Sequence, residues 1–292
     1  KEFFRGIDVL VVPENNSLEL KKDHALAHLK LVRVRHGAGD RDVSFGSNAT
    51  QFDLTLVAGD KYYERLQKQS GVKKDNLAIV GYPKFDVIGN RTHKILFDND
   101  NPSVLYNPHF KNGLSSWQDW GKQVLEFFVA NPQYNLILAP HVILYLRKWR
   151  HGGFSLKRYQ NIPNIHIDTG SQKCIDMTYL EQADIYMGDV SSQVYEFLSE
   201  PRPCIFLNPH GFDWQNDPNF LFWHCGDVLT NIDNLPIALE QAKEKHKAEF
   251  KKTQKKLFNE TFSLNDDPSS FRAADAIVDK FAPKELRHKN QT

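Results

Sequence analysis

Three of the 12 histidines follow apolar runs that have the composition of buried strands. His36 ends the segment VRVRH, His109 follows LYNP, and His141 follows LILAP. Because histidine titrates near neutral pH, a neutral imidazole at such a position can take a proton from a hydroxyl group. Asp40 could orient the His36 ring, so the sequence predicts a catalytic base, His36, assisted by Asp40. The competing interpretation is that His36 is a structural residue of a turn.

Small polar residues follow another strand-like run, in the segment ADIYMGDVSSQVYEFL. Gly188, Asp189, Ser191 and Ser192 stand between the apolar run and a helical pattern. A helix that begins there leaves backbone N–H groups unpaired and directs the positive end of its dipole toward an anion. The segment therefore predicts a phosphate-binding cradle. Alternatively, Ser191 or Ser192 simply caps the helix.

Cationic groups at other strand ends are further candidates for phosphate contacts. Arg35 precedes His36, and Lys84 lies in the segment GYPKFD after another apolar run. Such side chains bind phosphate oxygens through charge-assisted hydrogen bonds. A turn that leaves the first domain is an equally good interpretation of the Lys84 segment.

Several common site types find no support in the sequence. It contains neither a GxGxxG fingerprint nor a Walker segment. The three cysteines fit no metal-ligand spacing. The segment HALAH would place His24 and His28 on one face of a helix, but it lacks the glutamate of the metalloprotease motif, and two histidines on a solvated face explain it better. We expect no metal and no resident cofactor.

Charge and hydrophobicity narrow the partners and the compartment. The 37 basic and 36 acidic residues give a net charge of +1, which argues against a nucleic-acid partner. No apolar run is long enough for a membrane span, and the cysteines look reduced. A cytoplasmic protein is expected, possibly at the inner face of the cell membrane. The seven lysines of residues 243–256 indicate a solvated helix face, with anionic lipid as the alternative.

Strand and helix patterns alternate along the chain, with almost no hairpin signals. We expect strands at residues 8–12, 31–35, 54–58 and 77–80 and a helix at 61–69; a polar stretch at 89–103 marks a boundary, with a brief strand at 95–97. Beyond it we expect strands at 104–106, 136–139, 165–168, 185–187, 204–207 and 227–229, and helices at 117–130, 174–182, 193–198, 235–257 and 270–281.

This alternation predicts an α/β protein with two Rossmann-like lobes facing a cleft, the arrangement called GT-B. The acceptor-side lobe would span residues 1–95 and the nucleotide-donor lobe residues 100–285, with a frayed tail at 286–292. The abrupt start of the chain suggests a domain cut from a longer polypeptide, or a small N-terminal lobe.

Taken in order, these segments resemble the CDP-glycerol glycerophosphotransferase family, which includes the teichoic-acid polymerases. The family's His-Gly-Thr-Pro segment is matched at residues 36–39, its Phe-Asp pair at 52–53 and its Gly-Tyr-Pro-Arg-x-Asp segment at 81–86. Its Leu-Tyr-Ala-Pro-Thr strand is matched at 105–109, its Pro-His pair at 140–141, and its Ala-Asp-x-x-x-x-Asp-Tyr-Ser-Ser segment at 183–192, followed by Glu196.

The resemblance implies that a hydroxyl of a cell-surface polymer or lipid-linked saccharide displaces CMP at the β-phosphorus of a CDP-linked polyol. It implies His36 as the base, His141 as an acid or phosphate-binding group, and Ser191 and Ser192 as ligands of the pyrophosphate. The remaining donor-side candidates are Gly188, Asp189, His109, Lys84, Arg35 and Glu196.

The sequence departs from the family pattern beside the expected site. Residues 38–40 replace Thr-Pro and the residue after it, His109 replaces a threonine, and Lys84 replaces an arginine. The donor and acceptor are therefore left open. A GT-B glycosyltransferase or sugar-nucleotide epimerase is the first alternative, and a non-catalytic nucleotide-sugar-binding module is the second.

Overall fold

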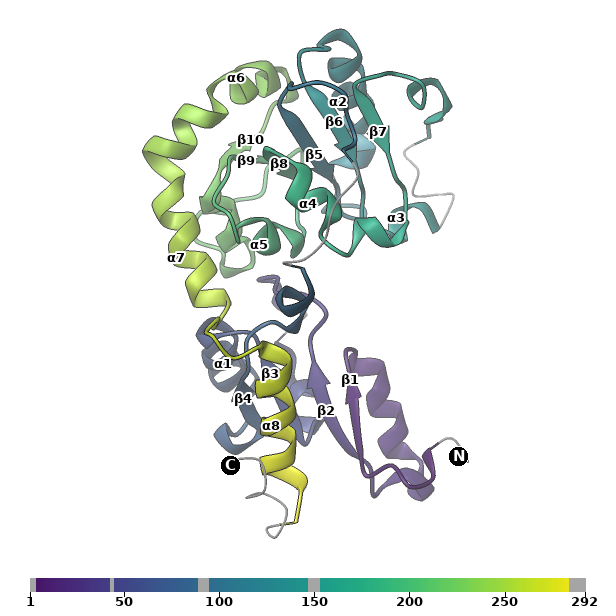
Figure 1. Ribbon diagram of the computed structural model, residues 1–292, viewed down its shortest axis with the longest axis vertical. Coiled ribbons are helices and arrows are strands. Elements are labelled where there is room, and N and C mark those ends of the chain that lie inside the picture. The colour runs from purple at the N-terminus through teal and green to yellow at the C-terminus, as the bar shows by residue number, and fades with distance from the viewer. Residues whose placement is uncertain (1–3, 43–44, 89–94, 147–152, 284–292) are drawn as a thin grey trace. The chain divides into compact units, whose positions relative to one another are not determined.

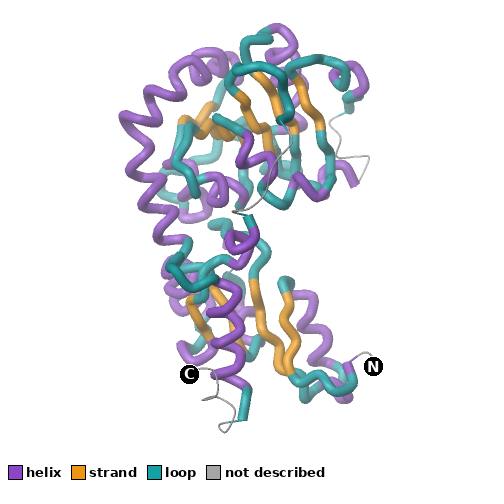
Figure 2. The backbone as a smooth tube through the Cα atoms, in the orientation of Figure 1, coloured by secondary structure: helices purple, strands orange, loops and turns teal. Residues whose placement is uncertain are grey.

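The computed structural model describes residues 4–42, 45–88, 95–146 and 153–283. The chain divides into two compact units. Unit 1 comprises Lys1–Arg91 and Phe258–Thr292, and unit 2 comprises Thr92–Leu257. Both contain a parallel sheet with helices packed on it (Figure 1; Figure 2).

Unit 1 contains a four-stranded parallel sheet whose strands lie in chain order. The strands are β1 (Val9–Val12), β2 (Lys30–Val34), β3 (Leu54–Val57) and β4 (Leu77–Ile79). Their valines, leucines and isoleucines fit a pleated surface that is buried by helices. Because all four strands run parallel, the residues that follow them collect at one edge of the sheet.

One face of this sheet is covered by the last helix of the chain, α8 (Ser269–Phe281). Ala273 and Ile277, one turn apart on α8, pack against Leu54 and Leu56 of β3. The sequence pattern placed this helix in the second lobe. The structure assigns it to unit 1, because its apolar face is buried on the strands of that sheet.

The other connections in unit 1 are short. His24 begins a single 3₁₀ turn, and His28 lies beyond it, so the expectation of one helix carrying both histidines is wrong. The expected helix at 61–69 is α1 continued by a π turn. These connecting elements are η2 (Asn15–Lys22), η3 (His24–Leu26), η5 (Ser47–Gln51), α1 (Asp60–Arg65), η6 (Leu66–Ser70), η7 (Lys74–Asn76) and η8 (Pro83–Val87).

Unit 2 contains six parallel strands in the spatial order β10-β9-β8-β5-β6-β7. The strands are β5 (Ser103–Asn107), β6 (Asn135–Leu138), β7 (Ile165–Ile167), β8 (Ile185–Gly188), β9 (Cys204–Leu207) and β10 (Asp227–Leu229). This is the strand order of Rossmann-type nucleotide-binding domains. The chain reverses direction across the sheet between the neighbouring strands β5 and β8.

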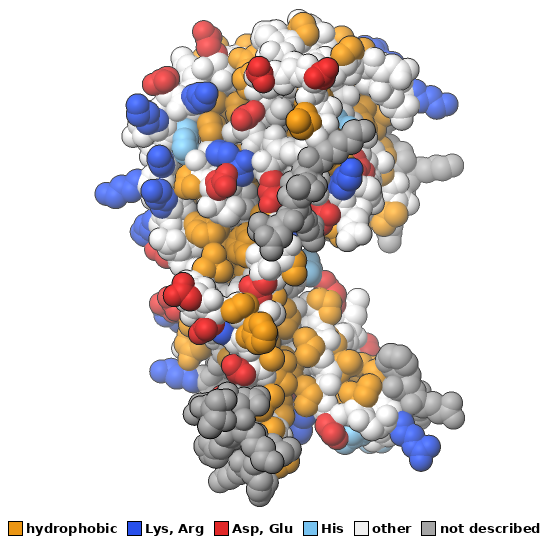
Figure 3. All heavy atoms as spheres, in the orientation of Figure 1, with side chains coloured by type: hydrophobic (Ala, Val, Ile, Leu, Met, Phe, Trp, Pro, Cys, Tyr) orange, Lys and Arg blue, Asp and Glu red, His pale blue; other side chains and the backbone are white. Residues whose placement is uncertain are grey.

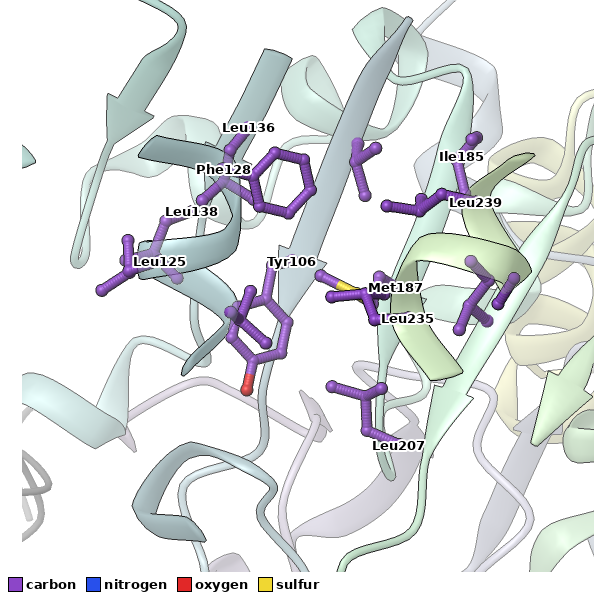
Figure 4. Close-up of a cluster of buried hydrophobic side chains, with 14 of the residues drawn as sticks. Tyr106, Leu125, Phe128, Leu136, Leu138, Ile185, Met187, Leu207, Leu235 and Leu239 are labelled. Carbon is purple, nitrogen blue, oxygen red and sulfur yellow. The ribbon is translucent and has the colours of Figure 1, made fainter. Parts of the chain in front are cut away.

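Helices complete unit 2, and their apolar faces form its core (Figure 4). Leu125 and Phe128 of α2 pack with Leu136 and Leu138 of β6. The helices are α2 (Trp117–Ala130), α3 (Ile143–Leu146), α4 (Thr178–Gln182), α5 (Gln193–Phe197), α6 (Leu235–Lys245), the π turn η14 (His246–Phe250) and α7 (Lys251–Thr261), whose last turn belongs to unit 1. Short 3₁₀ turns are η10 (Lys157–Tyr159), η11 (Gln172–Cys174), η12 (Pro218–Cys225) and η13 (Ile232–Asn234).

Two expectations for unit 2 are wrong in detail. The helix expected at 174–182 begins only at Thr178, because Met177 adopts a left-handed backbone conformation with φ of 72°. Residues 95–97 form no strand. Among the residues that the structure describes, no helix combines the length and the hydrophobicity needed to cross a membrane.

Candidate functional site

The reversal point of the unit 2 sheet brings together residues from separate parts of the chain. Asn107 ends β5 and Gly188 ends β8, and these two residues pair in register. The segments that follow, starting with Pro108 and Asp189, therefore leave the same edge of the sheet side by side. In open α/β sheets ligands bind at this edge, at the reversal point. The predicted cradle thus lies where the fold favours nucleotide binding.

Asp189 ties these segments to one another. Its carboxylate accepts hydrogen bonds from the backbone N–H groups of His109 at 2.8 Å, Ser116 at 2.6 Å and Val190 at 2.6 Å, and from the Ser116 hydroxyl at 2.8 Å. Its backbone carbonyl accepts from the Trp223 indole at 2.8 Å. The side chain is buried, and burial raises the pKa of Asp189 while the hydrogen bonds oppose the rise. In this geometry Asp189 holds the loops in place.

The two predicted cradle serines differ in their environment. Ser191 is buried, and its Oγ accepts from the N–H of Gln193 at 3.3 Å, a local contact two residues along the chain from a position that precedes the N-cap residue, Ser192. Ser192 is half-buried and makes no capping hydrogen bond through its side chain. The helix that follows, α5, has only 5 residues, and its Glu196 is buried. The dipole of so short a helix is small, which leaves N–H and hydroxyl groups as the main donors.

Gly188 is needed for close packing at this point. A Cβ atom added to it would lie 3.0 Å from the carbonyl oxygen of Asn107 and 3.0 Å from the Tyr186 hydroxyl. The glycine thus lets β8 approach β5 at the edge where the site lies.

His109 and His141 lie together at the ends of the neighbouring strands β5 and β6. Their ring centroids are 5.7 Å apart, and Phe110 packs 4.5 Å from both rings. In each ring Nδ1 accepts a backbone N–H, from Lys111 at 3.1 Å for His109 and from Ile143 at 3.2 Å for His141. An accepting Nδ1 has no proton, so the neutral rings carry hydrogen on Nε2. Both histidines are therefore set as Nε2–H donors.

The ring of His36 in unit 1 contacts a carboxylate through Nδ1, where His109 and His141 accept a backbone N–H. His36 follows β2, and its Nδ1 lies 2.6 Å from the Oε1 of Glu14. An ionised carboxylate only accepts hydrogen bonds, so the ring places its proton on Nδ1 and keeps a lone pair on Nε2. The backbone of the loop is held by the Tyr82 hydroxyl, which donates to the His36 carbonyl at 3.3 Å. Of the three strand-end histidines, His36 is the one set to accept a proton.

Asp40 was expected to orient the His36 ring, but the structure shows a different contact for its carboxylate. Asp40 is buried, and its Oδ1 lies 2.9 Å from Nζ of Lys61. Its carbonyl accepts from Arg65 at 2.6 Å. The pair with Lys61 fixes the loop after His36 to α1. The carboxylate on the ring itself is Glu14.

Arg35 borders a small cavity at the same edge of the unit 1 sheet. The cavity holds about 20 Å³, and residues on β3 and after β4 also line it. This is space for one water molecule or one oxygen atom of a ligand. The guanidinium of Arg35 lies 5.4 Å from the ring centroid of Tyr62.

The segment GYPKFD, which contains Lys84, docks the last helix. Asp86 accepts from the N–H groups of Ser269 at 3.0 Å and Ser270 at 2.6 Å, at the start of α8. The N–H of Tyr82 donates to the Ser269 hydroxyl at 2.9 Å. Lys84 is half-buried at the start of η8. The contacts of Tyr82 and Asp86 are therefore structural, and they leave the role of Lys84 as a prediction.

Sequence reasoning missed a network after β7. Burial alone would raise the pKa of Asp168, but hydrogen bonds from Ser171 and Tyr179 hold it well below its ordinary value. The Tyr179 hydroxyl donates to Asp168 at 2.6 Å and lies 3.0 Å from Nε2 of His166. An aspartate followed by Gly170 and Ser171 is a turn signal that could have marked this loop.

The lysine-rich stretch at 243–256 lies on α6, η14 and α7 (Figure 3). Lys243, Lys247, Lys251 and Lys255 are exposed there, and so are the two glutamates of the stretch, Glu244 and Glu249. In the described ranges, no group of three or more metal-binding side chains could hold a metal ion.

Solved structures of other proteins share the fold of this chain. The wall teichoic acid polymerase TagF matches with a TM-score of 0.67 and 15% identity over 94% of this chain and 73% of TagF. A putative UDP-N-acetylglucosamine 2-epimerase from Listeria monocytogenes matches with a TM-score of 0.61 and 18% identity over 96% of this chain and 76% of that one. These likenesses confirm the α/β fold class, with the parallel sheets of GT-B proteins.

A search among curated proteins found none that matches. The sequence model of CDP-Glycerol:Poly(glycerophosphate) glycerophosphotransferase, in contrast, matches residues 11–279. That range contains all strands of both sheets except the start of β1, together with all three strand-end histidines, and it bears out the resemblance drawn from the sequence. The chain belongs to the CDP-Glycerol:Poly(glycerophosphate) glycerophosphotransferase family.

Proposed function

We propose that this protein transfers a glycerol phosphate unit from a CDP-linked donor to a hydroxyl group of a polymer or lipid-linked acceptor, and releases CMP. The observation that carries the proposal is the opposite pairing of Nδ1 in the strand-end histidines, within a chain of this family: Nδ1 of His36 contacts a carboxylate, whereas Nδ1 of His109 and of His141 accepts a backbone N–H. His36 offers a lone pair at Nε2, whereas His109 and His141 offer Nε2–H donors. A transfer of this kind needs one proton acceptor and several donors.

His36 acts as the base. Its Nε2 takes the proton of the acceptor hydroxyl as the oxygen attacks the β-phosphorus of the donor. A positioned base of this kind contributes about 10² to 10⁴ in rate.

His141, His109 and the residues after β8 act on the phosphate groups. Hydrogen bonds from Nε2–H groups and from Ser192 stabilise the negative charge that develops on the phosphoryl oxygens and on the departing CMP. Asp189 contributes by holding the His109 and Ser116 loops in position. A variant of TagF soaked with CDPG has the same fold, with a TM-score of 0.68 and 16% identity over 94% of this chain and 72% of that one.

The donor is identified by a turnover screen. The protein is incubated with an acceptor and, in separate reactions, with CDP-glycerol, CDP-ribitol, UDP-sugars and CMP-sugars, and the released nucleotide is measured. We expect CMP release from a CDP-polyol. Release or epimerisation of a UDP-sugar alone would identify a GT-B glycosyltransferase or epimerase, and binding without turnover of any donor would identify a non-catalytic module.

The base is tested by His36→Ala, with His28→Ala as the matched control at an exposed histidine. Loss of the base should lower kcat by about 10² to 10⁴, while calorimetry shows donor binding within twofold of the wild type. His28→Ala should match the wild type in both measurements. Normal turnover of His36→Ala would contradict the assignment.

A further inference from the structure

We propose that Glu14 is the positioning residue of the base: it holds the proton of His36 on Nδ1 and so directs the Nε2 lone pair at the acceptor hydroxyl. This inference rests on the role proposed for His36. Nothing in the family pattern drawn from the sequence includes Glu14, which follows β1 and stands 22 positions before His36 in the chain.

The Glu14 carboxylate contacts the His36 ring and not the backbone of η2. Glu14 occupies the N-cap position of η2, where a side chain of this length could accept from the helix N–H groups, yet it makes no capping bond. Its Oε1 instead lies 2.6 Å from Nδ1 of His36, across two adjacent parallel strands. The carboxylate of Glu14 is thus directed at the ring of His36.

The contact between Glu14 and His36 lies at the protein surface. The side chains of His36 and Glu14 are 67% and 56% exposed. Exposed ion pairs contribute little to folding, because water screens the charges, so the fold gains little from this pair. Exposure does leave the far side of the ring open to a substrate. Orientation of the imidazole is the effect that such a contact provides.

Glu14 also acts on the buried cation Arg33. Arg33 on β2 is buried, and burial together with the positive charge of Arg35 lowers the pKa of Arg33 to about 10, against an opposing effect of Glu14. Glu14 thus acts on a buried cation and on the His36 ring at once. His36 itself contacts Glu14 through Nδ1, and its carbonyl accepts from the Tyr82 hydroxyl.

The proton and the electrons balance in the step this arrangement serves. The acceptor oxygen forms a bond to the β-phosphorus, and its proton moves to Nε2 of His36. The bond from that phosphorus to the bridging oxygen breaks, and its electron pair leaves with CMP. The ring is then an imidazolium with both nitrogens protonated, and the Glu14 carboxylate stabilises its charge.

Kinetics test the inference in the full chain. Glu14→Ala should lower kcat about tenfold or more, by less than His36→Ala, with KM for the donor within twofold of the wild type. Glu14→Asp should restore part of kcat. Glu19→Ala, at an exposed glutamate of η2 that pairs with Lys22, is the control and should change nothing.

A readout that needs no turnover separates this inference from the proposed function. Nitrogen-15 NMR of the His36 ring should show the neutral form protonated at Nδ1 in the wild type and at Nε2 in Glu14→Ala. A wild-type ring protonated at Nε2, or a Glu14→Ala enzyme with unchanged kcat, would overturn the inference. If the wild type turns over no donor, the proposed function fails, and the ring protonation alone decides whether Glu14 sets His36.

Discussion

Two carboxylates of this protein act on the candidate site without contacting a substrate in the proposed reaction. Asp189 is buried and accepts from the loops that follow β5 and β8, whereas Glu14 is exposed and contacts a ring nitrogen. A buried carboxylate that loses its partners costs far more than an exposed one, because water can replace the partners only at the surface. Substitutions at Asp189 and Glu14 should therefore affect stability and rate differently.

Asp189→Asn should destabilise the protein and weaken donor binding. An amide nitrogen cannot accept hydrogen bonds, so at least one of the N–H groups of His109 and Ser116 would remain unpaired, at a cost of about 1 to 3 kcal/mol. Urea unfolding and calorimetry with CDP-glycerol check the two effects. Asp213→Asn, at an exposed aspartate after β9, is the control and should leave both unchanged. An unaltered urea midpoint in Asp189→Asn would show that the loops do not depend on the carboxylate.

At the scale of elements, the docking of α8 explains the GYPKFD segment. Burial alone would raise the pKa of Asp86, but hydrogen bonds from Ser270 and Ser269 hold it below its ordinary value. The stability that this cap contributes is therefore present above the ordinary carboxyl pKa and is lost as the pH falls through the folded-state value. Gly81 permits the approach of the helix, because a Cβ there would overlap atoms of Ser269 and Arg272. Its φ of +83° also favours glycine.

Gly81→Ala should be markedly more destabilising than Gly71→Ala. Both glycines have a left-handed backbone, at φ of 83° and 71°, so each substitution costs about 1 to 2 kcal/mol in backbone strain. A Cβ at Gly71 would meet no atom within 4 Å, but at Gly81 it would lie 2.2 Å from Nη2 of Arg272 and 2.8 Å from the carbonyl oxygen of Ser263. Thermal unfolding of both variants gives the comparison. Equal losses of Tm would mean that α8 shifts without cost.

At the scale of the whole molecule, the chain leaves unit 1 near residue 91 and returns to it near residue 258. The sheet of unit 1 lacks cover on one face until α8 is present, because Ala273 and Ile277 bury Leu54 and Leu56. The first strands of the chain and its last helix should therefore unfold together.

Hydrogen exchange tests this coupling through Asp86→Ala. Loss of the cap should cost about 1 kcal/mol, which speeds exchange roughly fivefold for amides that open with the whole unit. We expect faster exchange in peptides from both β2–β4 and α8, with no change in β5–β9. Asp275→Ala, at an exposed aspartate within α8, should match the wild type. Faster exchange confined to α8 would show that the helix opens independently of the sheet.

Local sequence patterns were enough to predict most element types and the strand-end positions of His36, His109 and His141. Apolar runs of strand length between amphipathic stretches left few alternatives, so β9, β10 and α2 were placed to the residue, and the ordered segments led to the family. These are local patterns, and local periodicity follows directly from which face of an element is buried.

Contacts between distant segments were decided only by the tertiary structure. Glu14 meets His36, Lys61 meets Asp40, and Asp189 meets Ser116, each across a gap in the chain that no spacing rule spans. The assignment of α8 to the first sheet is of the same kind. A parallel sheet brings such residues together because each crossover returns the chain to the same edge, and the partner at that edge depends on strand order rather than on neighbours in sequence.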